Sequence, residues 1–269
     1  DGTRRKLSKR KDPEAAVSFY HEKGIPIEAV KLYLTTIANS NFESWYDANK
    51  DKTIDDFKLD FKKISASGTL FDLDKMLNIS KNYISRLKAS EVYEASLKWA
   101  LEFDKELYDL LTKYKDYSIN LFNIEREQKK PRKDYSCYSD IKNQIWYMYD
   151  ELFDTKENVY SNVEIKKYYN SDILFDYINN YYNSNDTKDE WYEKVKQLAT
   201  KYGFAANVKD YKENPDDYNG HVGDVCEFIR VAITSLTMTP DLYELLRLLG
   251  EDRIKNRFNK FSEYMKNSK

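Results

Sequence analysis

Helix boundary signals recur along the whole chain and limit its fold more than any other feature. Asp12 followed by Pro13 predicts a helix start, because a cap carboxylate accepts from free backbone N–H groups and proline fits the first helical position. Gly24 then supplies a stop. A threonine cap, a proline and a closing glycine recur over residues 239–250. The sequence therefore predicts short helices whose starts and ends are marked by nearby residues.

Apolar residues between these boundaries recur at every third or fourth position, which places them on one face of a helix. Segments 27–39 and 71–87 show this spacing, and a nearly uninterrupted helical pattern runs from Ser90 to about Glu127. No stretch alternates apolar and polar residues beside a hairpin turn, as strands do. We therefore predict an all-α protein with two or three helical subdomains.

Composition excludes several classes of protein. No apolar run approaches the roughly 20 residues of a membrane-spanning helix, and no signal peptide is visible, so we expect a cytoplasmic protein without a membrane partner. Cys137 and Cys226 lie far apart, without a CxxC or a histidine-rich neighbourhood. This spacing predicts two free thiols, and neither a disulfide framework nor a metal site.

Positive charge is concentrated at the start of a chain whose net charge is −2. Six of the eight residues from Arg4 to Lys11 are basic. A localisation signal, a nonspecific nucleic-acid tail and a phosphate-handling loop all have this composition. Because the overall balance is slightly acidic, any contact with a polyanion must come from such local patches.

A second basic segment, REQKKPRK at 126–133, is interrupted by a proline and followed by two tyrosines. A surface that reads single-stranded bases needs cations for phosphates, planar groups for stacking and donors for base edges. This segment supplies all three, and the alternative is an ordinary solvated loop between two helices. The candidate residues for such a nucleic-acid surface are Arg126, Lys129, Arg132, Lys133, Tyr135 and Tyr138.

KLSKR at residues 6–10 resembles the KMSKS signature of class I aminoacyl-tRNA synthetases. The blocks GIPIEAVKLYLTTIA and SGTLFDLDKMLNISKNYI, which follow it, are similar to segments of bacterial glutamyl-tRNA synthetases. Near the end, IRVAITSLTMTPDLYELLRLLGEDRIKNRF is similar to the closing pattern of that family. The three blocks occur in the family's order, and the resemblance is weaker over roughly 101–206.

The resemblance implies a fragment of a glutamate–tRNA ligase that begins at the catalytic signature loop. Residues 1–95 would form that loop and an elongated helical stem-contact region. Residues 96–269 would form a helical anticodon-binding domain, with subdomains at about 96–185 and 186–269. The nucleotide-binding domain would precede both, so the fragment alone is expected to be inactive.

The same resemblance implies roles for the signature residues. Lys9 is the lysine placed on the phosphates of ATP, with Lys6 in support and Ser8 as a hydroxyl donor. Negative charge builds on the phosphates as pyrophosphate leaves, and an ammonium group on a mobile loop can meet it in the transition state. The remaining cations of the run are expected to serve loop solvation or attraction of the tRNA backbone: Arg4, Arg5, Arg10 and Lys11.

The resemblance also implies cofactors and partners. The full-length enzyme would use ATP with Mg²⁺, glutamate and tRNA(Glu), and would act as a monomer. The fragment itself would hold no cofactor tightly.

Two alternatives stay open at this point. A helical protein-interaction module with a basic localisation signal would have no affinity for tRNA. The equivalent part of a lysyl or glutaminyl synthetase would share the signature, although a helical second half disfavours the usual glutaminyl architecture. Whether the parent enzyme also charges glutamine tRNA depends on anticodon contacts in the weakly matched middle.

Overall fold

The computed structural model describes residues 5–49, 52–64 and 69–268, and all regular structure within these ranges is helical. Two isolated β-bridges, Asn39 with Ile64 and Ala205 with His221, are the extent of strand-like pairing there. The prediction of an all-α protein is confirmed. No helix in the described ranges is both long enough and apolar enough to cross a membrane.

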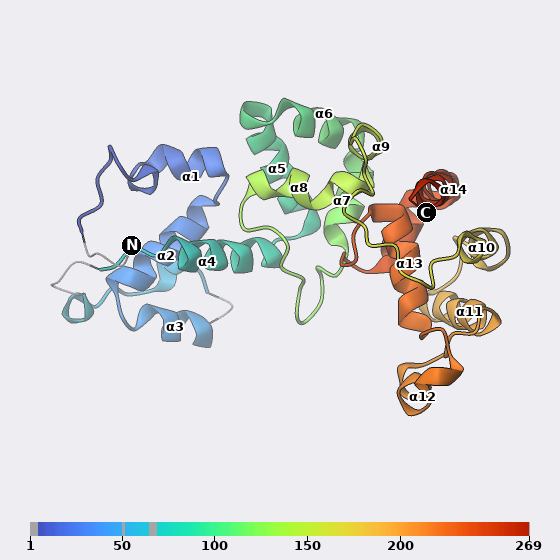
Figure 1. Ribbon diagram of the computed structural model, residues 1–269. Coiled ribbons are helices and arrows are strands. Elements are labelled where there is room, and N and C mark those ends of the chain that lie inside the picture. The colour runs from blue at the N-terminus through green and yellow to red at the C-terminus, as the bar shows by residue number, and fades with distance from the viewer. Residues whose placement is uncertain (1–4, 50–51, 65–68, 269) are drawn as a thin grey trace. The chain divides into compact units, whose positions relative to one another are not determined.

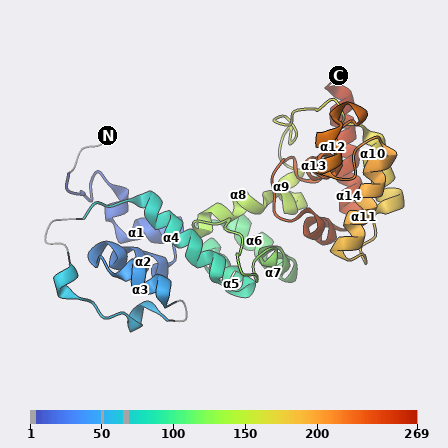
Figure 2. The ribbon, with the colours of Figure 1, turned by 90° about the horizontal axis from the view of Figure 1, so that it is seen from below.

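Contacts divide the chain into two compact units, Asp1–Gln144 and Ile145–Lys269, which are coloured blue to green and green to red in Figures 1 and 2. The functional boundary predicted near residue 95 falls inside a continuous helix of the first unit and stays a prediction. The principal helices of the first unit are α1 (Val17–Lys23), α2 (Ile27–Ala38), α3 (Phe42–Ala48), α4 (Leu73–Arg86), α5 (Ala89–Phe103), α6 (Lys105–Lys113) and α7 (Lys115–Asn123). The short α8 (Ile141–Ile145) lies at the division.

The core of the first unit forms where α2 packs against α4, and the two helices lie side by side in Figures 1 and 2. Tyr33 of α2 and Met76 of α4 are fully buried in it. Cys137, from the segment that follows α7, joins the same cluster. Ser80 Oγ donates to the carbonyl of Ser136 at 2.6 Å, so that segment is fixed along the core rather than held only at its two ends.

Gly24 ends α1 as predicted, with a φ of 71° that favours glycine. Its backbone also approaches its neighbours closely, because an added Cβ would lie 2.9 Å from atoms of Trp99 and Tyr138. The carbonyl of Gly24 accepts from the Tyr138 N–H at 2.9 Å. The glycine therefore ends a helix and lets the segment after α7 pack against α1.

The nearly uninterrupted helical pattern predicted from Ser90 to about Glu127 forms three successive helices, α5, α6 and α7. Asp104 interrupts the pattern, since its carboxylate accepts from the Leu107 N–H at 3.1 Å and caps α6. Tyr114 leaves helical geometry between α6 and α7. A periodic apolar face continued through these breaks and concealed them.

The second unit contains α9 (Asp150–Phe153), α10 (Ser171–Asp176), α11 (Lys188–Lys201), α12 (Val208–Glu213), α13 (Val222–Thr234) and α14 (Leu242–Asn267). Its core lies between α13 and α14, where Phe228 and Phe258 are buried. The predicted stop at Gly250 appears as a kink within α14, with a φ of 74°. The predicted cap by Thr239 is wrong, because the Asp241 carboxylate accepts from the N–H of Glu244 and caps that helix.

Arg257 of α14 connects three parts of the second unit and is only 1% exposed. Its guanidinium donates to the carbonyls of Tyr147 at 2.5 Å and Ile233 at 2.6 Å, and to the carboxylate of Asp150 at 2.7 Å. It also lies 4.2 Å from the ring centre of Phe153. This arginine supplies a charged donor to buried backbone carbonyls on two separate segments.

Replacing Arg257 by methionine should therefore lower the free energy of unfolding by about 2–4 kcal/mol, because two buried carbonyls and the Asp150 carboxylate lose a charged donor. Lys260→Met is the matched control on the same helix, since Lys260 pairs with Asp154 at a half-exposed site. We expect the control to cost less than about 1 kcal/mol. Urea unfolding of the two variants measures both, and equal costs would contradict the structural role of Arg257.

Candidate nucleic-acid interface

The second half of KLSKR enters a tight turn over residues 8–11, ahead of α1. The carbonyl of Ser8 accepts from the N–H of Lys11 at 2.9 Å and of Asp12 at 2.8 Å. Lys9 is exposed on this turn and Lys6 is exposed just before it, whereas Ser8 is half-buried. Arg4 lies outside the described residues. The structure thus presents the two predicted catalytic lysines to solvent, beside the Ser8 backbone that defines the turn.

Asp12 does not cap the first helix as predicted, although it stands at the cap position. Its carboxylate instead accepts from the backbone N–H of Ser8 at 2.7 Å and from both terminal nitrogens of Arg5, at 2.7 and 2.5 Å. The Arg5 hydrogen bonds, followed by that of Ser8, hold the pKa of Asp12 at about 2. Arg5 was expected to be a solvated cation, and the structure shows it paired.

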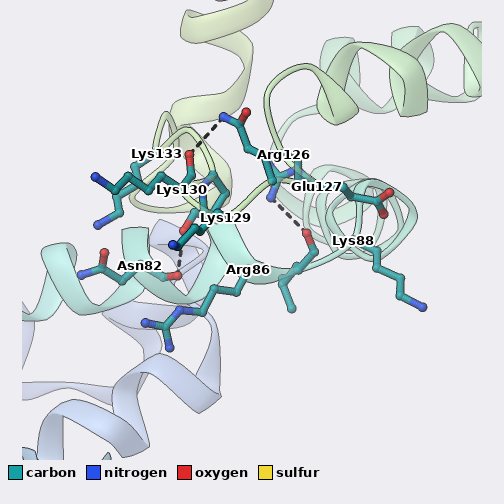
Figure 3. A pocket seen from close by; sticks show the side chains of 12 residues that line it. Asn82, Arg86, Lys88, Arg126, Glu127, Lys129, Lys130 and Lys133 are labelled. Carbon is teal, nitrogen blue, oxygen red and sulfur yellow. Dashed lines mark hydrogen bonds between the residues drawn. The ribbon is translucent and has the colours of Figure 1, made fainter. Parts of the chain in front are cut away.

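The first unit also contains a basic cleft of about 860 Å³. It lies where α4 passes into α5 and where the segment after α7 crosses that junction (Figure 3). We call it the α4–α5 cleft. Its walls are Asn82, Ser85, Arg86, Leu87, Lys88, Arg126, Glu127, Gln128, Lys129, Lys130, Pro131 and Lys133.

Arg126 belongs to the framework of this cleft. It is 8% exposed, and its guanidinium donates to the carbonyls of Phe122 at 2.7 Å, Ile84 at 2.7 Å and Leu87 at 3.1 Å. Burial lowers the pKa of Arg126 below its ordinary value. These bonds satisfy carbonyls at the ends of α4 and α7, where a helix lacks its own donors. The side chain predicted to meet tRNA therefore holds two helix ends together.

Lys129 and Lys133, with Lys130 between them, are exposed along the cleft, and within the described ranges no carboxylate pairs with them. Figure 3 places the three lysines on one side of the cleft, and Asn82 and Arg86 of α4 on the other. Arg132 differs, because it donates to Asp134 at 2.7 Å and lies 3.7 Å from Glu125. The lysines are therefore the loop cations available to an anion.

The two predicted stacking residues pack inward. Tyr135 is 6% exposed, and its ring meets that of Phe122 edge to face at 5.9 Å. Tyr138 is partly buried, and this burial raises its pKa. A base could stack on Tyr135 only if the segment moved. In this conformation the cleft offers cations and hydrogen-bond donors, which suit phosphate groups better than bases.

Five residues of the cleft lie outside the predicted basic segment: Asn82, Ser85, Arg86, Leu87 and Lys88. They lie about 40 residues before the basic segment and show no charge cluster of their own. The available signal was the break in helical pattern after residue 86, which identifies a helix end. That break does not indicate which distant segment crosses it.

The charge of the two units differs in sign. The first unit has 27 lysines and arginines against 24 acidic residues, and the second has 17 against 22. The α14 cations of the second unit are largely engaged, since Arg257 is buried, Lys255 pairs with Glu251 and Lys260 pairs with Asp154. Attraction of a polyanion therefore favours the first unit. No cluster suited to a metal ion occurs in the described ranges.

Comparisons with known proteins add the family. A sequence model described as "Anticodon binding domain" matches residues 210–262. The glutamate–tRNA ligase of Clostridium perfringens (strain SM101 / Type A) is 43% identical over 263 residues, which cover 97% of this chain and 48% of the relative. That of Acetivibrio thermocellus is 44% identical over 260 residues, covering 97% and 47%. This chain is a homologue of the glutamate–tRNA ligases. It spans about half the length of the curated relatives it matches.

A solved glutamate–tRNA ligase structure shares the fold. The chain from Elizabethkingia meningosepticum superposes with a TM-score of 0.60 at 14% sequence identity, covering 96% of this chain and 48% of that one. Within this chain, the match to the anticodon-binding model lies in the second unit and includes parts of α12 and α14 with all of α13. The 126–138 segment lies outside that match, in the first unit.

Arg126 and Lys133 should respond differently to substitution. Arg126→Met should destabilise the protein by about 2–3 kcal/mol, because carbonyls at two helix ends lose a charged donor. Lys133→Met removes an exposed cation from the same segment and should stay within about 0.5 kcal/mol of the wild type. Urea unfolding tests the pair. A neutral Arg126 variant would show that its hydrogen bonds do not stabilise the cleft.

Proposed function

We propose that this chain is the tRNA-binding part of a glutamate–tRNA ligase, an enzyme that attaches glutamate to tRNA(Glu) with ATP. The observation that carries the proposal is 43% identity to such a ligase over 97% of the chain, together with an exposed KLSKR turn at residues 6–10. The nucleotide-binding fold would lie in the part of the relatives that this chain does not span, so the chain alone would be inactive. The helical interaction module is not favoured, because it would leave the homology unexplained.

In this proposal the turn acts on ATP. Lys9 places its ammonium on the phosphates, Lys6 supports it, and Ser8 supplies a hydroxyl donor. ATP carrying Mg²⁺ would supply the phosphate charge that these groups meet. An ammonium group suits this task because it is a compact point charge on a flexible stem.

The α4–α5 cleft would bind the phosphate backbone of the tRNA. Lys129, Lys130 and Lys133 lie across it from Arg86, so cations on both sides could neutralise the phosphates of a bound strand. The second unit would read the anticodon, supported by the family match at 210–262. Because that unit is acidic overall, its recognition would rest on specific hydrogen bonds and stacking rather than on net attraction.

The finer parts of the proposal follow from the same assignment. Residues 1–95 would form the stem-contact part and 96–269 the anticodon-binding part. Arg132 and Tyr138, both partly exposed, remain candidate tRNA contacts. The full-length enzyme would be a cytoplasmic monomer that takes glutamate and tRNA(Glu).

The cleft assignment predicts how RNA binding depends on salt. The triple variant Lys129→Gln, Lys130→Gln and Lys133→Gln should weaken binding of tRNA(Glu) by the chain roughly 10- to 100-fold at moderate salt. It should also reduce the slope of log affinity against log salt by about 2–3, since each lost phosphate contact releases about one counterion fewer. Filter-binding titrations over a series of salt concentrations measure both quantities.

The matched control removes the same charge from exposed helix positions of the same unit, through Lys23→Gln, Lys31→Gln and Lys98→Gln. We expect it to leave affinity and slope nearly unchanged. Equal losses in the two triple variants would mean that the cleft is not the backbone site. Wild-type affinity that ignores salt, or that is equal for a tRNA with an unrelated anticodon, would contradict the proposed function itself.

The turn assignment predicts a kinetic effect in the full-length ligase. Lys9→Ala should lower the rate of glutamate activation by on the order of 100-fold, and should change the KM for ATP much less, because a transition-state contact is lost. Pyrophosphate exchange with tRNA supplied measures both constants. A loss confined to KM would show that Lys9 only binds ATP in its ground state.

A further inference from the structure

One buried carboxylate organises the KLSKR turn from outside the signature. Asp12 is 5% exposed, although it stands among cations at the chain's beginning. It accepts from the Ser8 backbone N–H within the signature and from the Arg5 guanidinium just before it. The same carboxylate therefore joins the residue that precedes the turn to the backbone at its centre.

The choice of Arg5 as partner has a consequence for the neighbouring lysines. A carboxylate next to Lys11 and three residues after Lys9 in the sequence could pair with either lysine and cancel charge that an anionic ligand must meet. Arg5 occupies both carboxylate oxygens through its planar fork. Within the described residues, Lys6, Lys9 and Lys11 have no ion-pair partner.

We propose that Arg5 and Asp12 are positioning residues for the KLSKR turn. Their pair fixes the Ser8 backbone and keeps Asp12 from neutralising Lys9, so that the Lys9 ammonium stays free for the phosphates of ATP. This inference rests on the proposed function, because it assumes that Lys9 meets those phosphates. Neither residue touches the ligand in this role.

Geometry explains why such a pair matters for rate. A contact that forms in the transition state loses its effect when the charged group is displaced, and a misplacement of about 1 Å costs on the order of 100-fold. The bidentate pair restricts two oxygens and two nitrogens to one plane, which a lysine at position 5 could not reproduce.

The test compares matched variants of the full-length ligase by pyrophosphate exchange with tRNA supplied. Asp12→Asn and Arg5→Lys should each lower kcat roughly 10- to 100-fold while the KM for ATP changes less than about threefold. The double variant should be no worse than the more severe single variant, because each removes the same pair. Glu14→Gln is the control, since it removes a nearby acid whose carboxylate makes no hydrogen bond or ion pair to Arg5 or Ser8 in the described residues.

A second measurement uses the chain itself and does not depend on activity. The carboxyl carbon of Asp12, followed by NMR, should titrate at about pH 2, and in Arg5→Gln the midpoint should move toward the ordinary value of 3.8. Because the folded pKa is the lower one, the pair stabilises the turn fully above about pH 4 and is lost as pH falls toward 2. Activity between pH 6 and 9 should therefore show no new titration from this pair.

The outcomes separate the two proposals. Normal kcat in Asp12→Asn and Arg5→Lys, alongside a defective Lys9→Ala, would overturn the positioning role and leave the proposed function standing. Normal kcat in Lys9→Ala would overturn the proposed function first. An Asp12 midpoint near 3.8 in the wild-type chain would show that the pair does not form in solution. Reduced kcat with unchanged KM, together with a low midpoint, supports the positioning role.

Discussion

The structure depends on how short helices satisfy the backbone groups at their ends. Each helix leaves several N–H and C=O groups without partners, and burial makes an unpaired group costly. Two buried arginines donate hydrogen bonds to such carbonyls. Arg126 joins the ends of α4 and α7, and Arg257 joins α14 to Tyr147 and Ile233. At helix starts, carboxylates accept from the free N–H groups, as the Asp104 carboxylate does for α6. The cations that donate to helix-end carbonyls are therefore buried in the protein and stabilise its fold.

This use of arginines also determines which cations remain for a ligand. Lysines 129, 130 and 133 are exposed beside the buried Arg126, and Lys6 and Lys9 are exposed beside the paired Arg5. In both places an arginine with fixed hydrogen bonds supports a backbone that presents lysines. This arrangement suits phosphate groups, because a rigid backbone positions mobile point charges. Both places lie in the first unit, whose charge is net positive, whereas the family match to an anticodon-binding model lies in the acidic second unit.

Local signals were predictable from the sequence, and distant pairings were not. The helical class and the stop at Gly24 follow from residues within one turn of each other. Asp12 could not be assigned from its neighbours, because a cap carboxylate and an ion-pair carboxylate look alike in sequence. The inward role of Arg126 depends on carbonyls about 40 residues away, at Ile84 and Leu87. For the same reason, the sequence did not predict that residues at the end of α4 line the cleft.

The central claim is that exposed lysines without ion pairs in the described residues contact the RNA backbone, and that the buried or paired basic residues do not. Chemical acetylation of the chain's lysines with and without tRNA(Glu), read by mass spectrometry, tests it most directly. Protection should appear at Lys129, Lys130 and Lys133, and should be absent at Lys23, Lys31 and Lys98 on exposed helix positions of the same unit. Lys260, which pairs with Asp154, should also be unchanged by tRNA. Equal protection of the helix lysines, or protection confined to residues 145–269, would contradict the account.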